Sequence, residues 1–202
     1  MKLSWTTLGV STMVMSILLL NSCSSDQKQQ KAVGQRADAA AQWATSGAVA
    51  GVEWKVPPEW PKGGEKPMRA ATYTVGSGDA LAECAVFFFG TGQGGDVEAN
   101  IARWILQVRQ PDGSDSKAKA VRAEVKSACC LITTVEVAGT YMASAGLMMQ
   151  EMAEKPGFVL LGGIVPGPQG NVFFKLTGPK ATVDKVKEDF QAMLRSVSKQ
   201  AD

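Results

Sequence analysis

The sequence contains no histidine among its 202 residues. This absence excludes Ser-His-Asp and Cys-His catalysis and most zinc or copper sites, because all of these use an imidazole ring. An excess of charge of one sign is missing too, since 21 lysines and arginines oppose 19 aspartates and glutamates, for a net charge of +2. A nearly neutral chain lacks the basic surface that nucleic acids require, so we expect no nucleic-acid partner.

Long apolar runs are also absent, because the apolar segment near the N-terminus, residues 8–20, is shorter than the roughly 20 residues that span a bilayer. Its length, after the start Met1-Lys2, is typical of the core of an export signal. The segment ends in Leu20-Asn21-Ser22-Cys23, which resembles the bacterial lipobox. The resemblance implies cleavage before Cys23, acylation of this cysteine, and a lipid anchor in the cell envelope, facing the periplasm or the exterior. An ordinary secretory signal with an incidental cysteine is the alternative.

The same resemblance sets the expected organisation of the chain. Residues 1–22 are predicted to be a lipoprotein signal peptide, and residues 23–50 a lipidated N-terminus and flexible tether, because residues 24–35 are polar and carry no core pattern. Residues 51–200 are then one globular domain with a single core. The residue after Cys23 is Ser24 rather than an aspartate. This resembles the pattern of lipoproteins that are sent to the outer membrane in bacteria with two membranes.

Hydrophobic patterning in this domain predicts strands in series and two separated helices. The first helix has apolar residues on one face from Val97 to Val108, with Asp96 as its N-cap, and the second has them from Val183 to Val197, with Thr182 as its N-cap. The strands are expected at residues 68–75, 82–89, 121–126, 129–140, 158–165 and 171–176, with 143–154 left open between a short helix and a loop. This series predicts an α+β fold with a single antiparallel β-sheet flanked by helices.

The order of these features resembles the PsbP/Mog1-like fold group. The chain has Trp54 and Trp60 among prolines, then strands, a helix after a glycine-rich turn, a late hairpin, and a final helix that carries Phe190 and Ser196-Val197. The resemblance covers residues 51–198 and implies an antiparallel sheet between helices, in a domain that often acts as a binding or assembly module. It brings no catalytic motif to this chain.

A glycine-rich segment, Gly90-Thr91-Gly92-Gln93-Gly94-Gly95, lies between a predicted strand and a predicted helix. It matches the G-x-G-x-x-G pattern of dinucleotide sites, in which backbone amides and a helix N-terminus hold pyrophosphate. Asp96 places a negative charge where the diphosphate would lie, and the preceding strands form a hairpin rather than a parallel β-α-β unit. We therefore expect either a tight turn or a loop that contacts a ligand or partner through Gly90, Gly92, Gln93, Gly94 and Gly95.

Three cysteines, Cys84, Cys129 and Cys130, remain after lipidation. Export permits disulfides, so either Cys129 or Cys130 is a candidate partner of Cys84. Both cannot reach it easily, because adjacent residues on a strand point to opposite faces. Buried free thiols are the alternative.

Met148, Met149 and Met152 form a cluster of thioethers, which are ligands that suit Cu(I). Adaptable packing is the alternative role of these methionines, and no other metal or cofactor is expected. Lys175 and Lys180 flank a predicted turn, so both are expected to be exposed.

No catalytic set emerges from these patterns. The carboxylates near the predicted sheet and loops, Glu83, Asp96, Glu98 and Glu136, are not paired at the separation that glycoside hydrolysis needs. We therefore expect a non-enzymatic lipoprotein whose domain binds an envelope protein or supports the assembly of a complex. A lipoprotein that binds a small ligand or copper is the first alternative, and a histidine-free hydrolase is the second.

Overall fold

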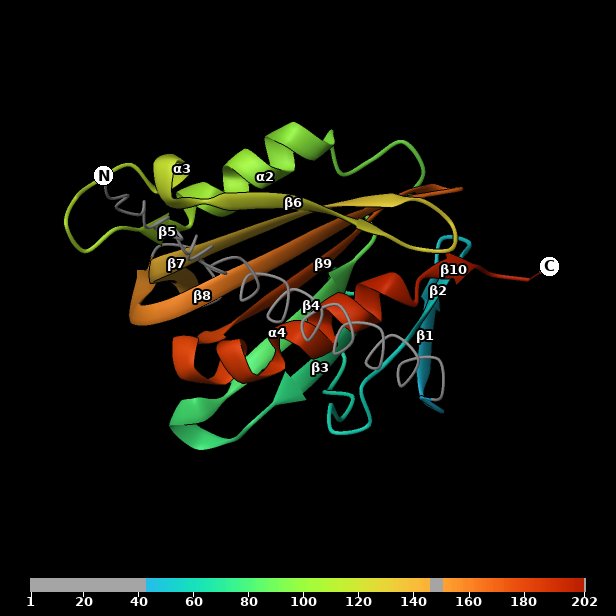
Figure 1. Ribbon diagram of the computed structural model, residues 1–202, viewed down its shortest axis with the longest axis horizontal. Helices are drawn as coiled ribbons and strands as arrows, with labels where there is room; N and C mark the ends of the chain where they lie inside the picture. Colours follow the sequence, from blue (N-terminus) through green and yellow to red (C-terminus); the bar gives the residue numbers. More distant parts are fainter. Residues whose placement is uncertain (1–42, 146–150, 202) are drawn as a thin grey trace, which may run out of the picture.

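The computed structural model describes residues 43–145 and 151–201, which fold into two antiparallel sheets with helices (Figure 1). The larger sheet has the strand order β3-β4-β9-β8-β7-β5, and β6 pairs with β7 beside β5. Its strands are β3 (Ala71–Val75), β4 (Ala82–Phe87), β5 (Val108–Arg109), β6 (Val121–Lys126), β7 (Leu131–Ala145), β8 (Glu151–Gly167) and β9 (Gly170–Pro179). The helices are η1 (Gly78–Ala80), α2 (Val97–Leu106), α3 (Ser116–Lys119) and α4 (Lys180–Arg195). The prediction of an antiparallel α+β fold is confirmed.

The prediction of one sheet is wrong, because a second sheet contains β1 (Ser46–Val49), β2 (Val52–Lys55) and β10 (Ser198–Lys199). β1 and β2 are joined by Ala50-Gly51, which both have positive φ, as a two-residue hairpin turn of the primed type requires. β1 lies within residues 23–50, so the predicted tether includes a strand of the domain. Such short strands carry too little periodicity to be detected in a sequence.

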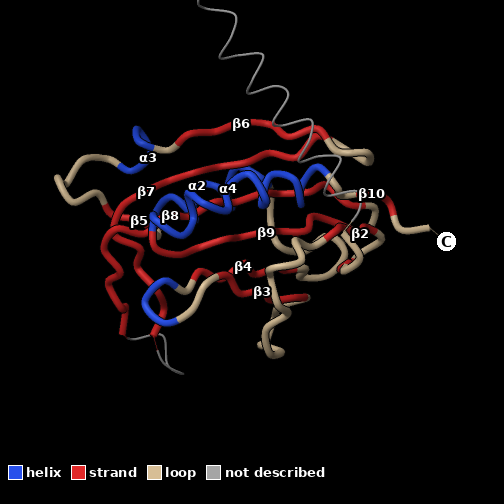
Figure 2. Tube along the Cα trace, turned by 60° about the horizontal axis from the view of Figure 1, so that its bottom comes forward, coloured by secondary structure: helices blue, strands red, loops and turns tan. Residues whose placement is uncertain are grey.

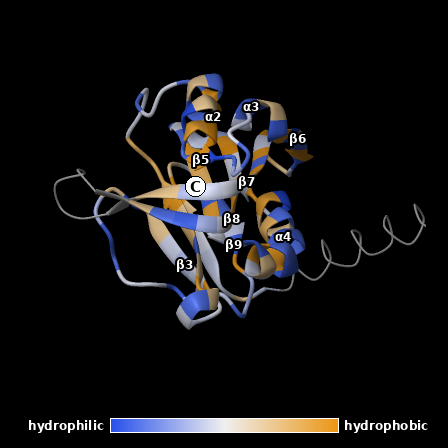
Figure 3. Ribbon diagram, turned by 90° about the vertical axis from the view of Figure 1, so that its left-hand side faces the viewer, coloured by the Kyte–Doolittle hydropathy of each residue, from blue (hydrophilic) through white to orange (hydrophobic). Residues whose placement is uncertain are grey.

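The larger sheet has a separate apolar core on each face. Side chains alternate between faces along β8, so Leu160 and Ile164 join the core beneath α2, whereas Leu161 and Val165 join the core that contains α4. Figure 2 shows both helices overlying the strands of the larger sheet, and Figure 3 shows hydrophobic residues on the two helices and the strands between them. The larger sheet is therefore the middle layer of a three-layer arrangement, with α2 on one face and α4 on the other.

Two adjacent glycines on β8 let the helices approach the sheet closely. A Cβ atom at Gly162 would lie 2.3 Å from the Trp104 ring of α2, and one at Gly163 would lie 2.8 Å from Leu194 of α4. Both helices therefore depend on positions that have no side chain. Phe190 of α4 is 2% exposed, in agreement with the predicted apolar face of the last helix.

The small sheet shares the α4 core through its aromatic residues. Trp54 is 1% exposed, packs edge-on against Phe174 with ring centroids 5.0 Å apart, and donates a hydrogen bond to the Tyr73 hydroxyl across 3.2 Å. Trp60 is also buried. These two buried tryptophans thus fix the segment that contains them onto the domain.

The N-cap of α2 agrees with the prediction from the sequence, whereas the N-cap of α4 differs from it. Asp96 caps α2 as predicted, because its carboxylate accepts a hydrogen bond from the Ala99 amide at 2.8 Å. The prediction of Thr182 as a cap is wrong: Pro179 occupies the N-cap of α4, and the Thr182 hydroxyl donates to the Ala80 carbonyl. The fixed φ of proline suits the start of a helix, which begins before the expected position.

Residues 143–145 and 151–154, left open between helix and loop, extend β7 and β8. Among the described residues, no helix combines the length and the apolar character that crossing a bilayer requires. Cys23 of the lipobox, together with Met148 and Met149, lies outside the described residues, and for Met152 only the backbone is described.

Candidate functional site

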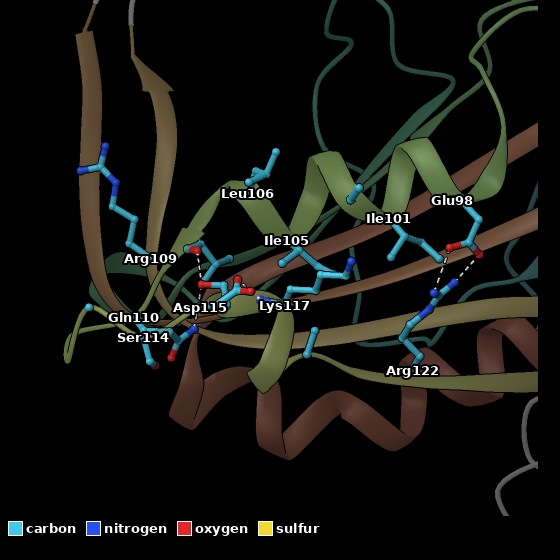
Figure 4. Close-up of a pocket in the computed structure, with 15 residues that line it drawn as sticks. Glu98, Ile101, Ile105, Leu106, Arg109, Gln110, Ser114, Asp115, Lys117 and Arg122 are labelled. Atoms are coloured by element: carbon cyan, nitrogen blue, oxygen red, sulfur yellow. Dashed lines mark hydrogen bonds and ion pairs between the residues drawn. The ribbon is translucent and has the colours of Figure 1, made fainter.

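A groove of about 860 Å³ lies between α2, α3 and the start of β6 (Figure 4). Ile101, Ile105 and Val108 form its apolar floor and are themselves buried. Leu106 lines the same groove but is 80% exposed. Charged side chains complete the lining: Glu98, Arg109, Asp115, Lys117 and Arg122.

The local sequence explains why α2 offers apolar surface on two sides. Ile101 and Ile105 are four residues apart and pack onto the sheet as one helical stripe. Leu106 directly follows Ile105, so it is rotated away from that stripe and faces solvent beside the groove. An apolar residue immediately after the core stripe is the signal by which Leu106 could have been found in the sequence.

Hydrogen bonds fix the opposite wall, the segment between β5 and α3. The Gln110 amide nitrogen donates to the Ala138 carbonyl at 2.9 Å and to the Ser116 hydroxyl at 3.1 Å. The Ser116 hydroxyl donates in turn to the Val108 carbonyl, and the Asp115 carboxylate accepts from the Lys117 amide at 2.8 Å. This wall is therefore held in place before any ligand arrives.

A pair of opposite charges crosses the groove from α2 to β6. The Arg122 guanidinium donates two hydrogen bonds to the Glu98 carboxylate, one of them at 2.9 Å (Figure 4). The hydrogen bonds from Arg122 lower the pKa of the Glu98 carboxyl and raise the pKa of the guanidinium. Both side chains are largely exposed, so a ligand can reorganise this pair at small cost.

This arrangement can hold an apolar group between charged side chains. An apolar floor with a few charged groups at the rim is typical of ligand and peptide sites, and the volume lies within the usual range of about 300–1,000 Å³. The Ser116 hydroxyl is engaged with a backbone carbonyl and not with a carboxylate base. The walls include two elements that the sequence predicts, the helix from Val97 and the strand from Val121. No pattern in the sequence indicates that these two elements are adjacent.

The glycine-rich segment forms a tight turn before α2. Gly90, Gly92, Gly94 and Gly95 all have positive φ, and the Gln93 amide donates to the Gly90 carbonyl at 3.0 Å. The buried Asn100 side chain donates to the Gly94 carbonyl at 2.7 Å. The turn interpretation agrees with this geometry, and these five residues do not line the groove between α2 and α3.

A second polar cluster lies on the sheet face that α2 covers, beside the C-terminal end of that helix. Lys175, expected to be exposed, is largely buried on β9 and donates hydrogen bonds to the Tyr141 hydroxyl at 3.0 Å and to Gln107. Burial, together with the smaller effect of the nearby Arg69 guanidinium, lowers the pKa of Lys175 to about 8. The expectation for Lys175 is wrong because β9 continues to Pro179 and keeps Lys175 within the sheet.

Arg69 has its own acidic partner in this cluster. Its guanidinium donates to the Glu83 carboxylate at 2.6 Å, and Lys66 donates to the same carboxylate. Burial alone would raise the pKa of Glu83, but the hydrogen bonds from Lys66 and Arg69 outweigh it and hold that pKa below the ordinary value.

The cysteines of the described region are free thiols in two separate places. Cys84 is fully buried in the α4 core, and burial raises the pKa of its thiol. Cys129 and Cys130 lie in the turn between β6 and β7, before the strand begins at Leu131. The prediction that their side chains point to opposite faces is wrong, because it assumed a strand where the chain turns.

No family model matches the sequence, and a search of the curated proteins finds no match. Among solved structures, the chain is similar to the solution structure of cyanobacterial PsbP (CyanoP) from Synechocystis sp. PCC 6803. The match covers 77% of this chain and 92% of that chain, with 11% sequence identity and a TM-score of 0.45. The likeness is distant and concerns the fold alone.

Proposed function

We propose that this chain is a lipid-anchored binding module of the cell envelope, whose groove between α2 and α3 receives an apolar segment of a protein partner. The exposed Leu106 beside a preformed apolar floor carries this proposal. The lipobox at Cys23 supplies the anchor, and the polar segment that follows supplies reach from the membrane.

The groove has the features from which a protein interface gains affinity. Leu106 costs free energy while it faces water, and covering it with a partner recovers about 1.5–3 kcal/mol. The hydrogen-bonded wall around Gln110 needs no reordering, so little of that gain is lost to entropy. Charged residues at the rim, such as Lys117 and Arg122, add selectivity for the charges that flank the apolar segment.

The carboxyl groups with shifted pKa values favour binding over hydrolysis. A general acid needs a carboxyl whose pKa is raised toward neutrality. The pKa values of Glu83, Glu98 and Asp112 are instead lowered, by hydrogen bonds from Lys66 and Arg69, from Arg122 and from Ser114. These groups are therefore suited to ion pairs and turns.

The test is a crosslinked affinity purification of the membrane-anchored full chain from its own envelope. Leu106→Asp places a charge beside the groove without touching the core, and Leu131→Asp is the matched control, because Leu131 is also exposed, at 51%, but lies outside the groove. We expect a stoichiometric partner with the natural chain and with Leu131→Asp, and at least a tenfold loss with Leu106→Asp. Equal recovery with both variants would overturn the groove as the binding site.

A small amphipathic ligand is the second candidate for the same groove, favoured by its volume. In that case the protein would be recovered without a partner, and native mass spectrometry would detect an organic molecule that Leu106→Asp releases. The copper alternative predicts instead a metal that depends on Met148, Met149 and Met152 and is indifferent to Leu106→Asp.

A further inference from the structure

The turn between β6 and β7 brings two thiols into contact. The sulfur atoms of Cys129 and Cys130 lie 2.8 Å apart, closer than the roughly 3.5–4.0 Å that separates even non-bonded carbon atoms. Both side chains are half-buried and pack against the edge of the α4 core. The two sulfur atoms are thus neighbours in the folded chain, which adjacent residues of an extended strand cannot be.

Ser127 holds this turn in shape. Its amide and its hydroxyl each donate a hydrogen bond to the Cys130 carbonyl at 3.0 Å, and the hydroxyl accepts one from the Cys130 amide at 3.2 Å. The same oxygen lies 3.4 Å from the Cys129 sulfur and 3.6 Å from the Cys130 sulfur. One serine therefore fixes the backbone of the turn and also contacts both thiols.

We infer that Cys129 and Cys130 form a redox-active dithiol that closes to a vicinal disulfide by exchange with a disulfide-bearing co-reactant. The inference does not depend on the groove between α2 and α3. It rests on the contact between the two sulfur atoms and on the turn that maintains it. Closure needs no movement of one element against another, because both residues belong to the same turn.

The exchange balances in two steps. The thiolate of Cys129 attacks one sulfur of the co-reactant, forms a mixed disulfide and expels the first thiolate. Cys130 then loses its proton and attacks the Cys129 sulfur, which forms the vicinal bond and expels the second thiolate. The two protons pass to the expelled thiolates, so the cysteine pair is oxidised by two electrons and the co-reactant disulfide becomes two thiols.

The burial of Cys130 favours Cys129 as the first thiol to attack. Burial raises the pKa of the Cys130 thiol to about 11, and the neighbouring Cys129 thiol contributes to this rise. We assign Cys130 as the resolving residue, which reacts once Cys129 has become an adjacent electrophile, and the two single-cysteine variants test this order. Cys84 takes no part, because it is fully buried in the core and its thiol pKa is raised by that burial.

The experiment is an equilibration of the full chain with reduced and oxidised glutathione, followed by acid quenching, alkylation and peptide mass spectrometry. We expect the peptide with Cys129 and Cys130 to lose two hydrogen atoms, to resist alkylation and to carry no glutathione. Cys84 lies on a separate peptide and should take up alkylating agent only after unfolding. A stable glutathione adduct on the natural chain, two alkylatable thiols throughout, or disulfide-linked dimers would each overturn the proposal.

Two variants separate the roles of the cysteines. Cys130→Ser removes the resolving thiol, so we expect a mixed disulfide to accumulate on Cys129, at least about tenfold above the natural chain. Cys129→Ser should form at least about tenfold less adduct, because Cys130 is then the only attacking group of the pair. Cys84→Ala is the control and should leave the vicinal couple unchanged. Circular dichroism of each variant checks folding, and equal adduct levels in the two single variants would contradict the assigned order.

Discussion

Lys175 donates a hydrogen bond to the Tyr141 hydroxyl across 3.0 Å, joining β9 to β7 at the open end of the sheet face that α2 covers. The ammonium group is largely buried, and burial lowers the pKa of Lys175 from 10.5 to about 8. A lysine whose pKa is depressed in the folded state disfavours folding while it is charged. The relationship between these two residues therefore predicts a pH dependence of stability.

We expect the free energy of unfolding to rise by about 2 kcal/mol between pH 8 and pH 10 through this one group. In this window the unfolded chain keeps the proton on Lys175 while the folded chain releases it, so the unfolded state binds more protons and stability increases with pH. Lys175→Met removes the titrating group, and urea unfolding at several pH values should show that this rise is lost.

Lys180→Met is the matched control, because the Lys180 side chain is 59% exposed and pairs with Asp184 on the surface of α4. Its stability curve should run parallel to that of the natural chain. The measurement must stop near pH 10, because burial raises the pKa of the Tyr141 hydroxyl and its ionisation then opposes folding. A Lys175→Met curve that keeps the natural slope would show that Lys175 does not titrate in this range.

Two glycines of the turn before α2 should respond very differently to the same substitution. A Cβ atom at Gly94 would lie 2.9 Å from Phe173 and 3.0 Å from Phe89, and φ there is +91°. At Gly92 φ is +71°, but nothing lies within 4 Å. We expect Gly94→Ala to cost about 3 kcal/mol, from backbone strain and overpacking, and Gly92→Ala about 1 kcal/mol, from strain alone.

Thermal or urea unfolding of the two variants checks this difference. Equal losses would mean that the aromatic contacts of Gly94 add nothing to the strain. If Gly92→Ala alone weakened binding of the envelope partner, the turn would be a contact surface as well as a structural one.

Periodicity made much of this fold predictable. β6 begins and ends at Val121 and Lys126 as expected, and Asp96 caps α2 because its carboxylate accepts a hydrogen bond from a free amide of the first turn. What periodicity could not give is the set of contacts between distant segments. Gly162 and Gly163 are two unremarkable glycines in the sequence, and only the folded sheet shows that Trp104 and Leu194 rest on them.

The candidate sites could not be predicted from the sequence for the same reason. The groove joins α2 to β6, and its Glu98–Arg122 pair links residues that no local pattern connects. The prediction for Lys175 is wrong because a charged residue beside a turn is usually exposed, whereas here the strand continues past Lys175. The contact between Cys129 and Cys130 depends on a turn whose position differs from the predicted start of the strand by two residues.

Phe190 tests whether α4 stabilises the domain through its apolar face. The ring is 2% exposed and lies in the core that α4 shares with the strands and with Val197. Phe190→Ala should lower the free energy of unfolding by about 3–5 kcal/mol, because it removes buried apolar surface and leaves a cavity. Lys185→Ala, on the exposed side of the same helix, is the control and should change stability by less than about 0.5 kcal/mol. An unchanged urea midpoint for Phe190→Ala would mean that α4 is not docked as described.

Cys23 provides the test of the proposed lipid anchor. Acyl chains on this residue would anchor the protein firmly, since each buried methylene contributes about 0.8 kcal/mol and more than one chain is attached in lipoproteins of this kind. Cys23→Ala leaves the predicted export signal in place but removes the sulfur atom proposed to be acylated, so we expect the protein to move from the membrane fraction to the soluble envelope fraction. Ser25→Ala, which lies outside the lipobox and leaves Cys23 in place, is the control and should stay with the membrane. If Cys23→Ala stayed in the membrane fraction and adding Leu106→Asp to the same chain did not release it, the lipid anchor would be contradicted. Release by the added Leu106→Asp would instead show that the groove holds the protein at the membrane.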